Sequence, residues 1–237
     1  MDDSFSKMCS LADASKSDRQ GFVKKVYGIL ATQLVVTFGF VAIAKSNPEL
    51  ENWLVHSWML FYPVLFMQIA ISCVISCCTR VARRTPHNYI LLTCFTLCWT
   101  YLIGFICAFY PAEIVLMAAG MTALISVAIS VFACVTDFDF TEACGPFICM
   151  GLLLVMCVSL VCSILSMIFF TFAQAWYPWA CGLCVIIYGL FLLCDTQMIV
   201  GGGRYELSID DYVLGAMMLY IDIIMLFLKL LEIFGRR

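Results

Sequence analysis

The sequence predicts an all-α integral membrane protein, a bundle of seven transmembrane helices. Two properties of its composition favour this class: 64% of the 237 residues are hydrophobic and only 12% are charged, and the mean hydropathy is +1.01. A soluble domain is about half apolar and about a quarter charged, so most side chains here must face lipid or one another. The third observation is spacing. A transmembrane helix needs about 20 mainly apolar residues, and seven such stretches follow one another between residues 26 and 235.

The predicted spans are separated by short polar breaks or by breaks that contain Pro or Gly. In order, they cover residues 26–44, 58–79, 89–109, 112–135, 145–171, 178–200 and 211–234. The breaks are Lys45–Ser57, Arg80–Asn88, Tyr110–Pro111, Thr136–Glu142, Gln174–Pro178 and Gly201–Ser208. Loops this short leave no room for an extramembrane domain, so we expect residues 22–237 to form a single membrane domain. Residues 1–21 are polar and lack the apolar core of a signal peptide, and we expect them to form a cytosolic segment.

The distribution of Lys and Arg predicts a cytosolic N-terminus, because basic residues are retained on the cytosolic side during insertion. This orientation places nine basic residues in the cytosol: Lys7, Lys16, Arg19, Lys24, Lys25, Arg80, Arg83, Arg84 and Arg204. The four that disagree are Lys45, Lys229, Arg236 and Arg237. The last span carries Asp222, Lys229 and Glu232, so it is either a central helix or a re-entrant segment that returns the C-terminus to the cytosol.

Charge and cysteine content exclude several classes of function. A net charge of −3 provides no basic surface for nucleic acid. Most of the 15 Cys lie inside apolar stretches and are typical of small packing residues. Cys181 and Cys184 have CxxC spacing, but they lie in a hydrophobic run, and the two histidines, His56 and His87, lie in predicted breaks. We therefore expect no disulfide framework, resident metal or cofactor.

The informative residues are carboxylates inside hydrophobic stretches, chiefly Asp195 and Asp222. Each costs at least a few kcal/mol at membrane depth unless it is paired, hydrated or protonated. Asp195 precedes the turn around Arg204–Ser208 by about as many residues as Asp222 follows it. The two side chains are therefore expected at similar depth in a helical hairpin, where they could meet.

A polar stripe is predicted on the last helix. Asp211, Asp222 and Lys229 are spaced by 11 and 7 residues, which places them within roughly 20° on one helical face. Cys184 and Tyr188 share the Asp195 face of the preceding helix, and Ser208 followed by Asp211 is typical of a capping box.

The carboxylate pair is interpreted as a cation site and a pH sensor. Two carboxylates a few ångströms apart cannot both ionise cheaply, so they are expected to share a proton. When both ionise, they form an oxygen-rich site suited to Ca²⁺. The alternative is a buried network that only fixes helix packing. Glu113, near the start of the fourth span, is a secondary candidate for the pore, but its position favours a simpler role in complementing the helix dipole.

Five segments of the chain resemble the transmembrane BAX inhibitor motif proteins, especially the lifeguard branch. They are FVKKVYGILATQLVVTFG (22–39), AFYPAEIVLMAAGMT (108–122), TDFDFT (136–141), CDTQMIVGGG (194–203) and LSIDDYVLGAMMLYIDIIMLFLKLLEIFGRR (207–237). The resemblance implies a seven-helix fold, residence in the Golgi, the endoplasmic reticulum or related membranes, Ca²⁺ leak from stores and protection against apoptosis. It fits a cellular or a virally captured member.

The resemblance also implies roles for particular residues. The carboxylate pair of the family falls on Asp195 and Asp222, and an acidic position at the mouth of the last helix falls on Asp210, beside Asp211. In some bacterial members a basic residue of the second helix latches the pair, whereas residues 58–79 here contain no Lys or Arg.

Four functions are candidates for a membrane bundle of this kind. The first is a pH-sensitive Ca²⁺-permeable leak channel, and the second a non-conducting adaptor that regulates apoptosis by binding partners. An intramembrane aspartyl protease is disfavoured because Asp195 follows Cys194, Asp222 follows Ile221, and no GxGD motif surrounds either residue. A ligand receptor is disfavoured by the short loops. We therefore expect a protein that is not an enzyme, a monomer or weak oligomer whose partners are the bilayer, Ca²⁺, protons and apoptosis-regulating membrane proteins.

Overall fold

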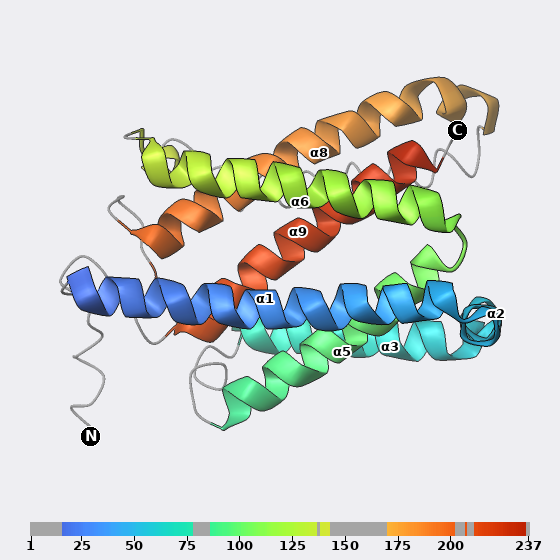
Figure 1. The fold of residues 1–237 in the computed structure, drawn as a ribbon, viewed down its shortest axis with the longest axis horizontal. Coiled ribbons are helices and arrows are strands. Elements are labelled where there is room, and N and C mark those ends of the chain that lie inside the picture. The colour runs from blue at the N-terminus through green and yellow to red at the C-terminus, as the bar shows by residue number, and fades with distance from the viewer. Residues whose placement is uncertain are drawn as a thin grey trace. The chain divides into compact units, whose positions relative to one another are not determined.

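Every regular element in the described part of the chain is helical. The computed structural model describes residues 16–77, 86–136, 138–142, 170–201, 207 and 211–235. Its elements are α1 (Lys16–Ser46), α2 (Pro48–His56), α3 (Trp58–Cys77), α5 (His87–Cys107), α6 (Ala112–Val135), α8 (Phe170–Val200) and α9 (Tyr212–Phe234), coloured in order in Figure 1. No strand occurs in these ranges, so the all-α prediction is confirmed for them.

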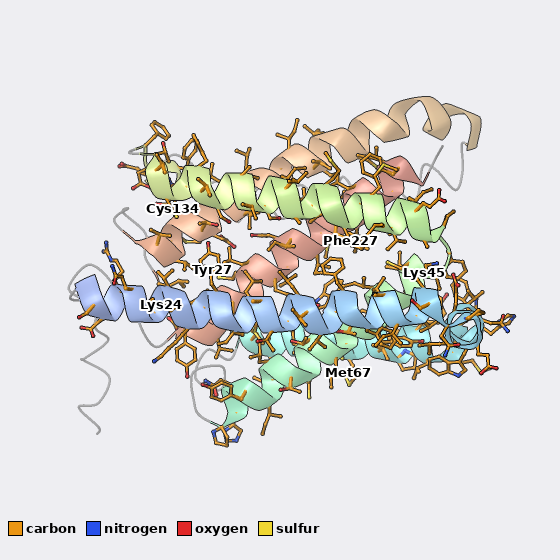
Figure 2. All side chains as sticks on the ribbon, in the orientation of Figure 1. Lys24, Tyr27, Lys45, Met67, Cys134 and Phe227 are labelled. Atoms are coloured by element: carbon orange, nitrogen blue, oxygen red, sulfur yellow. The ribbon has the colours of Figure 1, made fainter. Side chains whose placement is uncertain are left out.

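Six of these helices are long and apolar enough to cross a membrane: α1, α3, α5, α6, α8 and α9. They correspond to six of the predicted spans. The other, 145–171, lies outside the described residues apart from its last two, which belong to α8. Figure 2 shows side chains at the helix positions where their placement is described. Many of the exposed ones are large and apolar, such as Val35, Met59 and Leu116. Such a surface suits lipid, and the chain is an integral multi-pass membrane protein.

One predicted break is wrong, because Gln174–Pro178 lies inside α8 and Pro178 is the ninth residue of that helix. A proline removes one amide donor and weakens a helix in water. In lipid, ending the helix would expose several backbone groups without partners, so the chain continues through the proline. The same occurs at Pro63 inside α3.

Two other boundaries also differ from the prediction. The break Lys45–Ser57 contains α2, which begins at Pro48 after the N-cap Asn47. Oδ1 of Asn47 accepts hydrogen bonds from the amides of Glu49 and Leu50, at 3.0 and 3.4 Å, which stabilises the first turn. In addition, α1 begins at Lys16, ten residues before the predicted span, because its polar first turns are helical as well.

The chain forms two compact units. One contains residues 1–115 and 207–220, and the other contains residues 116–206 and 221–237. Helix α9 therefore contributes its first nine residues to the first unit and the rest to the second.

A ladder of buried hydrogen bonds connects helices of the first unit. This polar ladder consists of Gln33 and Thr37 on α1, Thr96 and Thr100 on α5, and Tyr220 on α9. Nε2 of Gln33 donates to Thr96 Oγ1 at 2.9 Å. The Thr37 hydroxyl shares hydrogen bonds with Thr100 Oγ1 at 3.1 Å and Tyr220 Oη at 2.7 Å. Because there is little hydrophobic driving force for apolar helices to associate in lipid, such bonds help to specify which helices pack together.

Helix α5 also packs closely on its two neighbours, α1 and α3. Gly104 allows the approach to α1, since a Cβ there would lie 2.5 Å from Phe40 Cε1. Towards α3, the ring centroid of Phe105 lies 4.6 Å from that of Phe61 and 5.0 Å from that of Trp58. Small and aromatic residues together hold α5 between the two helices.

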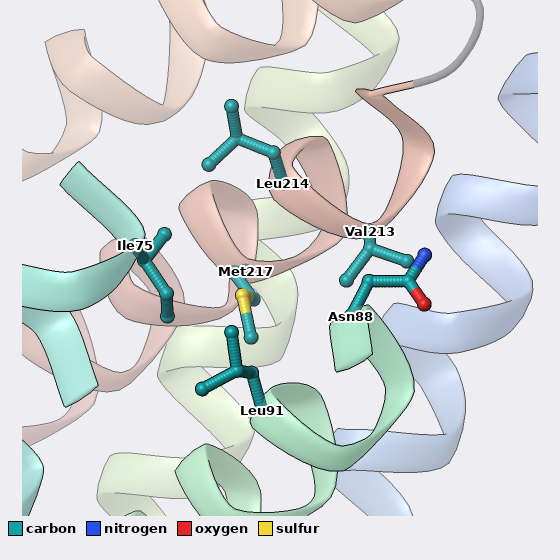
Figure 3. Close-up of a pocket in the computed structure, with 6 residues that line it drawn as sticks. All are labelled: Ile75, Asn88, Leu91, Val213, Leu214 and Met217. Atoms are coloured by element: carbon teal, nitrogen blue, oxygen red, sulfur yellow. The ribbon is translucent and has the colours of Figure 1, made fainter. Parts of the chain in front are cut away.

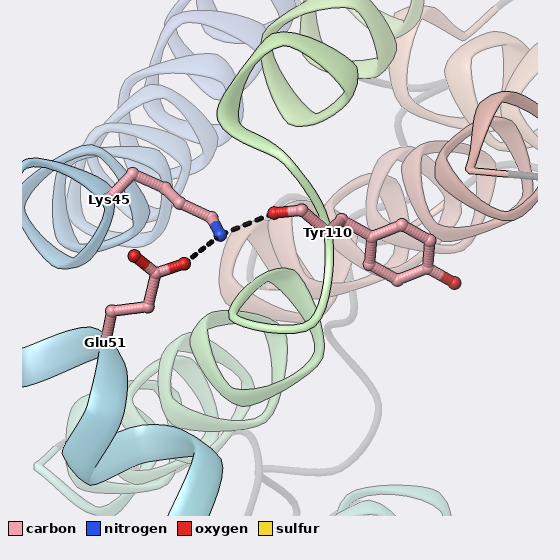
Figure 4. Close-up of polar contacts among 3 residues, drawn as sticks. All are labelled: Lys45, Glu51 and Tyr110. Carbon is pink, nitrogen blue, oxygen red and sulfur yellow. Dashed lines mark hydrogen bonds and ion pairs between the residues drawn. The ribbon is translucent and has the colours of Figure 1, made fainter. Parts of the chain in front are cut away.

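Lys45, in the last turn of α1, connects three segments of the first unit (Figure 4). Its Nζ donates to Glu51 Oε1 of α2 and to the backbone oxygen of Tyr110, both at 2.5 Å. Lys45 and Lys24 lie towards opposite ends of α1 (Figure 2). Lys45 is one of the basic residues that disagree with the predicted orientation, and its pairing with Glu51 neutralises that charge locally.

Candidate functional site

The first unit contains a small pocket with no ionisable side chain in its lining (Figure 3). It lies among α3, α5 and α9 and is lined by Ile75, Asn88, Leu91, Val213, Leu214 and Met217. A mostly apolar lining offers hydrophobic contact but no group for acid–base chemistry or cation binding. The ionisable groups inside the second unit are therefore the stronger candidates for a functional site.

Asp195 lies on α8, five residues before the helix ends at Val200. The helix stops because Gly201 has a φ of 77°, and its amide donates to the Gln197 oxygen at 2.9 Å. This left-handed conformation favours glycine and closes the last turn. Leu192, Leu193 and Cys194, which precede Asp195, are buried, and Asp195 itself is only 7% exposed.

Asp195 interacts directly with Asp222 of α9. The two carboxyl groups are close enough to share a hydrogen bond and to repel each other when both are charged, and Asp222 is also only 7% exposed. Oδ2 of Asp222 is buried without a hydrogen-bond partner. Two adjacent carboxylates in such surroundings repel when both are ionised, so a shared proton is the least costly state. The unpaired oxygen is an acceptor of the kind that a hard cation prefers.

Tyr188 extends the polar surface of α8 away from the pair. It lies one heptad before Asp195 and interacts electrostatically with Asp222 and with Cys184. This arrangement agrees with the common face expected for Cys184, Tyr188 and Asp195 from their spacing. The α8 side of the pair is therefore polar over about two helical turns.

Lys229 does not pair with either aspartate. Its Nζ lies 3.1 Å from Oε2 of Glu232, one turn further along α9, and the same oxygen lies 3.5 Å from the Cys181 thiol of α8. Two of the three stripe residues therefore belong to different groups: Asp222 pairs with Asp195, and Lys229 lies in a second group with Glu232 and Cys181.

The other candidates from the sequence belong to the first unit or lie outside the described residues. Asp211 is 4% exposed, precedes α9 and belongs to the first unit. Glu113 is exposed in the first turn of α6 and also belongs to the first unit. Its position suits an interaction with the positive end of the helix dipole. Asp210 lies outside the described residues.

Gln197 is a residue of the site region to which the sequence interpretation gave no role. Its Oε1 accepts from the Phe140 amide and its Nε2 donates to the Phe138 oxygen, both at 2.9 Å. The Gln197 side chain, two positions after Asp195 in the sequence, thereby satisfies two backbone groups of residues 138–142. The only hint in the sequence was that Gln197 belongs to the CDTQ block and Phe138 and Phe140 to the TDFDFT block.

Asp139 stabilises the same segment through hydrogen bonds within it. Its Oδ1 accepts from the Thr141 amide at 2.9 Å, the Thr141 hydroxyl at 2.6 Å and the Glu142 amide at 3.2 Å. This is the geometry of a helix N-cap. Residues 138–142 are therefore held from within by Asp139 and from α8 by Gln197.

The cysteines of the described residues form no disulfide and join no group of three metal ligands. Cys181 and Cys184 are both buried. The chemistry that the second unit offers is thus that of carboxylates in apolar surroundings.

A multi-pass helical membrane protein with a buried carboxylate pair on its last two helices is the class that this fold and site define. The family described as "Inhibitor of apoptosis-promoting Bax1" matches residues 19–237. The chain is 31% identical over 219 residues to protein lifeguard 3 of Homo sapiens and equally to that of Mus musculus, covering 92% of this chain and 70% of each relative. It is 29% identical over 238 residues to Bax inhibitor 1 of Schizosaccharomyces pombe, covering 98% of this chain and 83% of that protein.

The chain belongs to this Bax inhibitor family. The expected resemblance to transmembrane BAX inhibitor motif proteins, with lifeguard proteins among the relatives, is thereby confirmed.

Proposed function

We propose that this protein is a pH-sensitive, Ca²⁺-permeable leak channel of intracellular membranes that lowers store Ca²⁺ and inhibits apoptosis. The observation that carries the proposal is the buried Asp195–Asp222 pair with its unpaired Asp222 Oδ2. Ionisable residues inside a membrane are costly and usually mark an ion or proton path. The family description supports the part of the proposal that concerns apoptosis.

The pair connects pH to permeation through one proton. With a proton shared between them, the two carboxyl groups attract each other and present a single negative charge. Loss of that proton leaves two charges that repel each other and attract Ca²⁺. Acidification therefore favours the closed form, and deprotonation favours the cation-binding form.

Ca²⁺ flux from liposomes containing the pure protein tests this proposal. Wild type should conduct, with flux rising as pH increases through neutrality, and Asp195→Asn with Asp222→Asn should lose both the flux and its pH dependence. Glu49→Gln is the matched control, because it removes one carboxylate from an exposed position in the first turn of α2. A folded double variant with unchanged flux and pH dependence would show that the pair is not the ion site.

A non-conducting adaptor is the second candidate. The observation in its favour is that the family description and the name Bax inhibitor 1 refer to apoptosis and Bax, and not to ions. Such an adaptor should protect cells equally well when both aspartates are replaced by asparagine. Cell survival after an apoptotic stimulus, measured with the same double variant, separates the two candidates.

The proposed setting is a Golgi or endoplasmic reticulum membrane, with the plasma membrane as an alternative, and a cytosolic N-terminus. Nine of the 13 basic residues support this orientation. The proposed partners are lipid, Ca²⁺, protons and membrane proteins that regulate apoptosis, with the chain acting as a monomer or weak oligomer.

A further inference from the structure

Polar side chains from three helices of the first unit lie at the level of the middle of α5. This helix runs from His87 to Cys107. Its 21 residues are about 32 Å long, close to the hydrocarbon thickness of about 30 Å, so its middle is near the centre of the membrane. Gln33 of α1 is at this level because its Nε2 donates to Thr96 of α5 at 2.9 Å. Trp99 belongs to the same turn of α5 as Thr96.

Gln68 of α3 lies at the same level. Helices α3 and α5 meet on both sides of it. On one side, the ring centroids of Phe61 and Phe105 are 4.6 Å apart. On the other side, Ile75 and Leu91 line one pocket. Gln68 is seven residues from Phe61 and seven from Ile75, so it shares their face of α3 and lies midway, at the level of residue 98 of α5.

The mid-depth layer, which consists of Gln33, Gln68 and Trp99, contains four buried polar atoms without a hydrogen-bond partner among the described residues. They are Oε1 of Gln33, Oε1 and Nε2 of Gln68, and Nε1 of Trp99. Gln33 and Gln68 are each only 3% exposed. Buried polar groups in native proteins are nearly always hydrogen-bonded, and an unpaired amide is costly in apolar surroundings. The four atoms therefore indicate a ligand bound between the helices.

The chemistry of these atoms defines the ligand. Two of them are acceptors, on Gln33 and Gln68, and two are donors, on Gln68 and Trp99. Residues 26–44, 58–77 and 88–107 contain no Asp, Glu, Lys, Arg or His, so an ion bound here would lack a counter-charge. The ligand must be small and neutral, and it must donate as well as accept hydrogen bonds. Water has these properties, and buried water in proteins makes two to four such bonds.

We propose that the mid-depth layer is an internal hydration site, where water joins α1, α3 and α5 near the centre of the membrane. The water accepts hydrogen bonds from Gln68 Nε2 and Trp99 Nε1 and donates to the Oε1 atoms of Gln33 and Gln68. Through Gln33 the site continues into the polar ladder, and α3 is thereby connected to that ladder by bridging water. The site lies in the first unit, and the inference goes beyond the proposed cation site of the second.

X-ray radiolysis detects such water, because hydroxyl radicals formed from bound water oxidise the side chains beside it. In wild type in nanodiscs, mass spectrometry should find Trp99 oxidised. Met217 is the internal reference: its thioether is readily oxidised, but it is 3% exposed and lines the mostly apolar pocket, so it should be oxidised less. Gln68→Leu should lose most of the Trp99 oxidation. Gln20→Leu, which removes the same amide from an exposed position of α1, should retain it.

Thermal unfolding in detergent provides a second readout through its sign. If water pairs with Gln68, Gln68→Leu removes hydrogen bonds and leaves the remaining atoms of the layer without their shared partner, so Tm should fall. If the amide were dry and unpaired, an apolar side chain of similar size would relieve its cost, and Tm would rise. Gln20→Leu should change Tm little in either case.

Two outcomes count against the inference. An unoxidised Trp99 in wild type, or a higher Tm for Gln68→Leu, would overturn the hydration site. Trp99 oxidation that persists in Gln68→Leu would overturn the role of Gln68 in it. The wild-type oxidation decides the question even if Gln68→Leu does not fold. Neither measurement depends on Ca²⁺ flux, so the hydration site and the proposed channel can fail separately.

Discussion

Replacing Gln197 by leucine tests how firmly residues 138–142 are held to α8. The substitution keeps the approximate volume but removes two hydrogen bonds of 2.9 Å, one to the amide of Phe140 and one to the oxygen of Phe138. A neutral hydrogen bond contributes about 1 kcal/mol, so the free energy of local opening should fall by about 2 kcal/mol. This corresponds to about 30-fold faster exchange of the Phe140 amide hydrogen.

Hydrogen–deuterium exchange with mass spectrometry on the protein in nanodiscs measures this change. Thr196→Val is the matched control, because Thr196 is also buried but its hydroxyl donates to Leu192 of its own helix, at 2.6 Å. Unchanged exchange of residues 138–142 in Gln197→Leu, or an equal increase in the control, would refute the role assigned to Gln197. Exchange in α1 and α5 should remain at wild-type values in both variants.

Three further substitutions test other parts of the structure. Thr37→Val should lower the free energy of unfolding by about 1 kcal/mol, within the range measured for hydrogen bonds between membrane helices. Thr32→Val should have little effect, because the Thr32 hydroxyl is exposed and donates within α1. Thermal unfolding in detergent measures both variants. Gly104→Ala should cost about 1–3 kcal/mol from overpacking, and Gly120→Ala, with open space around its Cβ position, should cost less in the same assay. Wild type should lose thermal stability as pH rises through neutrality, because the second ionisation places two negative charges together, and Asp222→Asn should flatten that dependence.

Hydropathy was sufficient to predict the six described helices that are long and apolar enough to cross a membrane, because lipid imposes a length and a composition on each span. It failed at Pro178, where the cost of ending a helix in lipid exceeds the cost of a missing amide. It also missed α2, whose Asn47 cap and Pro48 start are local signals within what looked like a loop.

The proximity of Asp195 and Asp222 could be anticipated because both lie at similar distances from one turn, so helix geometry alone brings them to similar depth. The partners of Gln197 could not, because residues 138–142 are more than fifty positions away in the sequence and their contact depends on the tertiary fold. The Cys181–Glu232 contact is of the same kind, since it spans 51 positions. Spacing along one helix was informative, whereas pairing between distant segments required the structure.

The polar ladder also fixes the register of α1 against α5. Helices that meet through leucine, phenylalanine and valine can slide past each other at little cost in lipid, where the surroundings are as apolar as the interface. The contacts Gln33–Thr96 and Thr37–Thr100 are both four residues apart on parallel helices, so a slip of one turn would leave one contact unmade at each end. The depth of Lys45, eight residues beyond Thr37, is thus set from within the bundle. Replacing the residues of α1 that face lipid should leave that depth unchanged, so the outer surface can vary freely while the register of the helices stays the same.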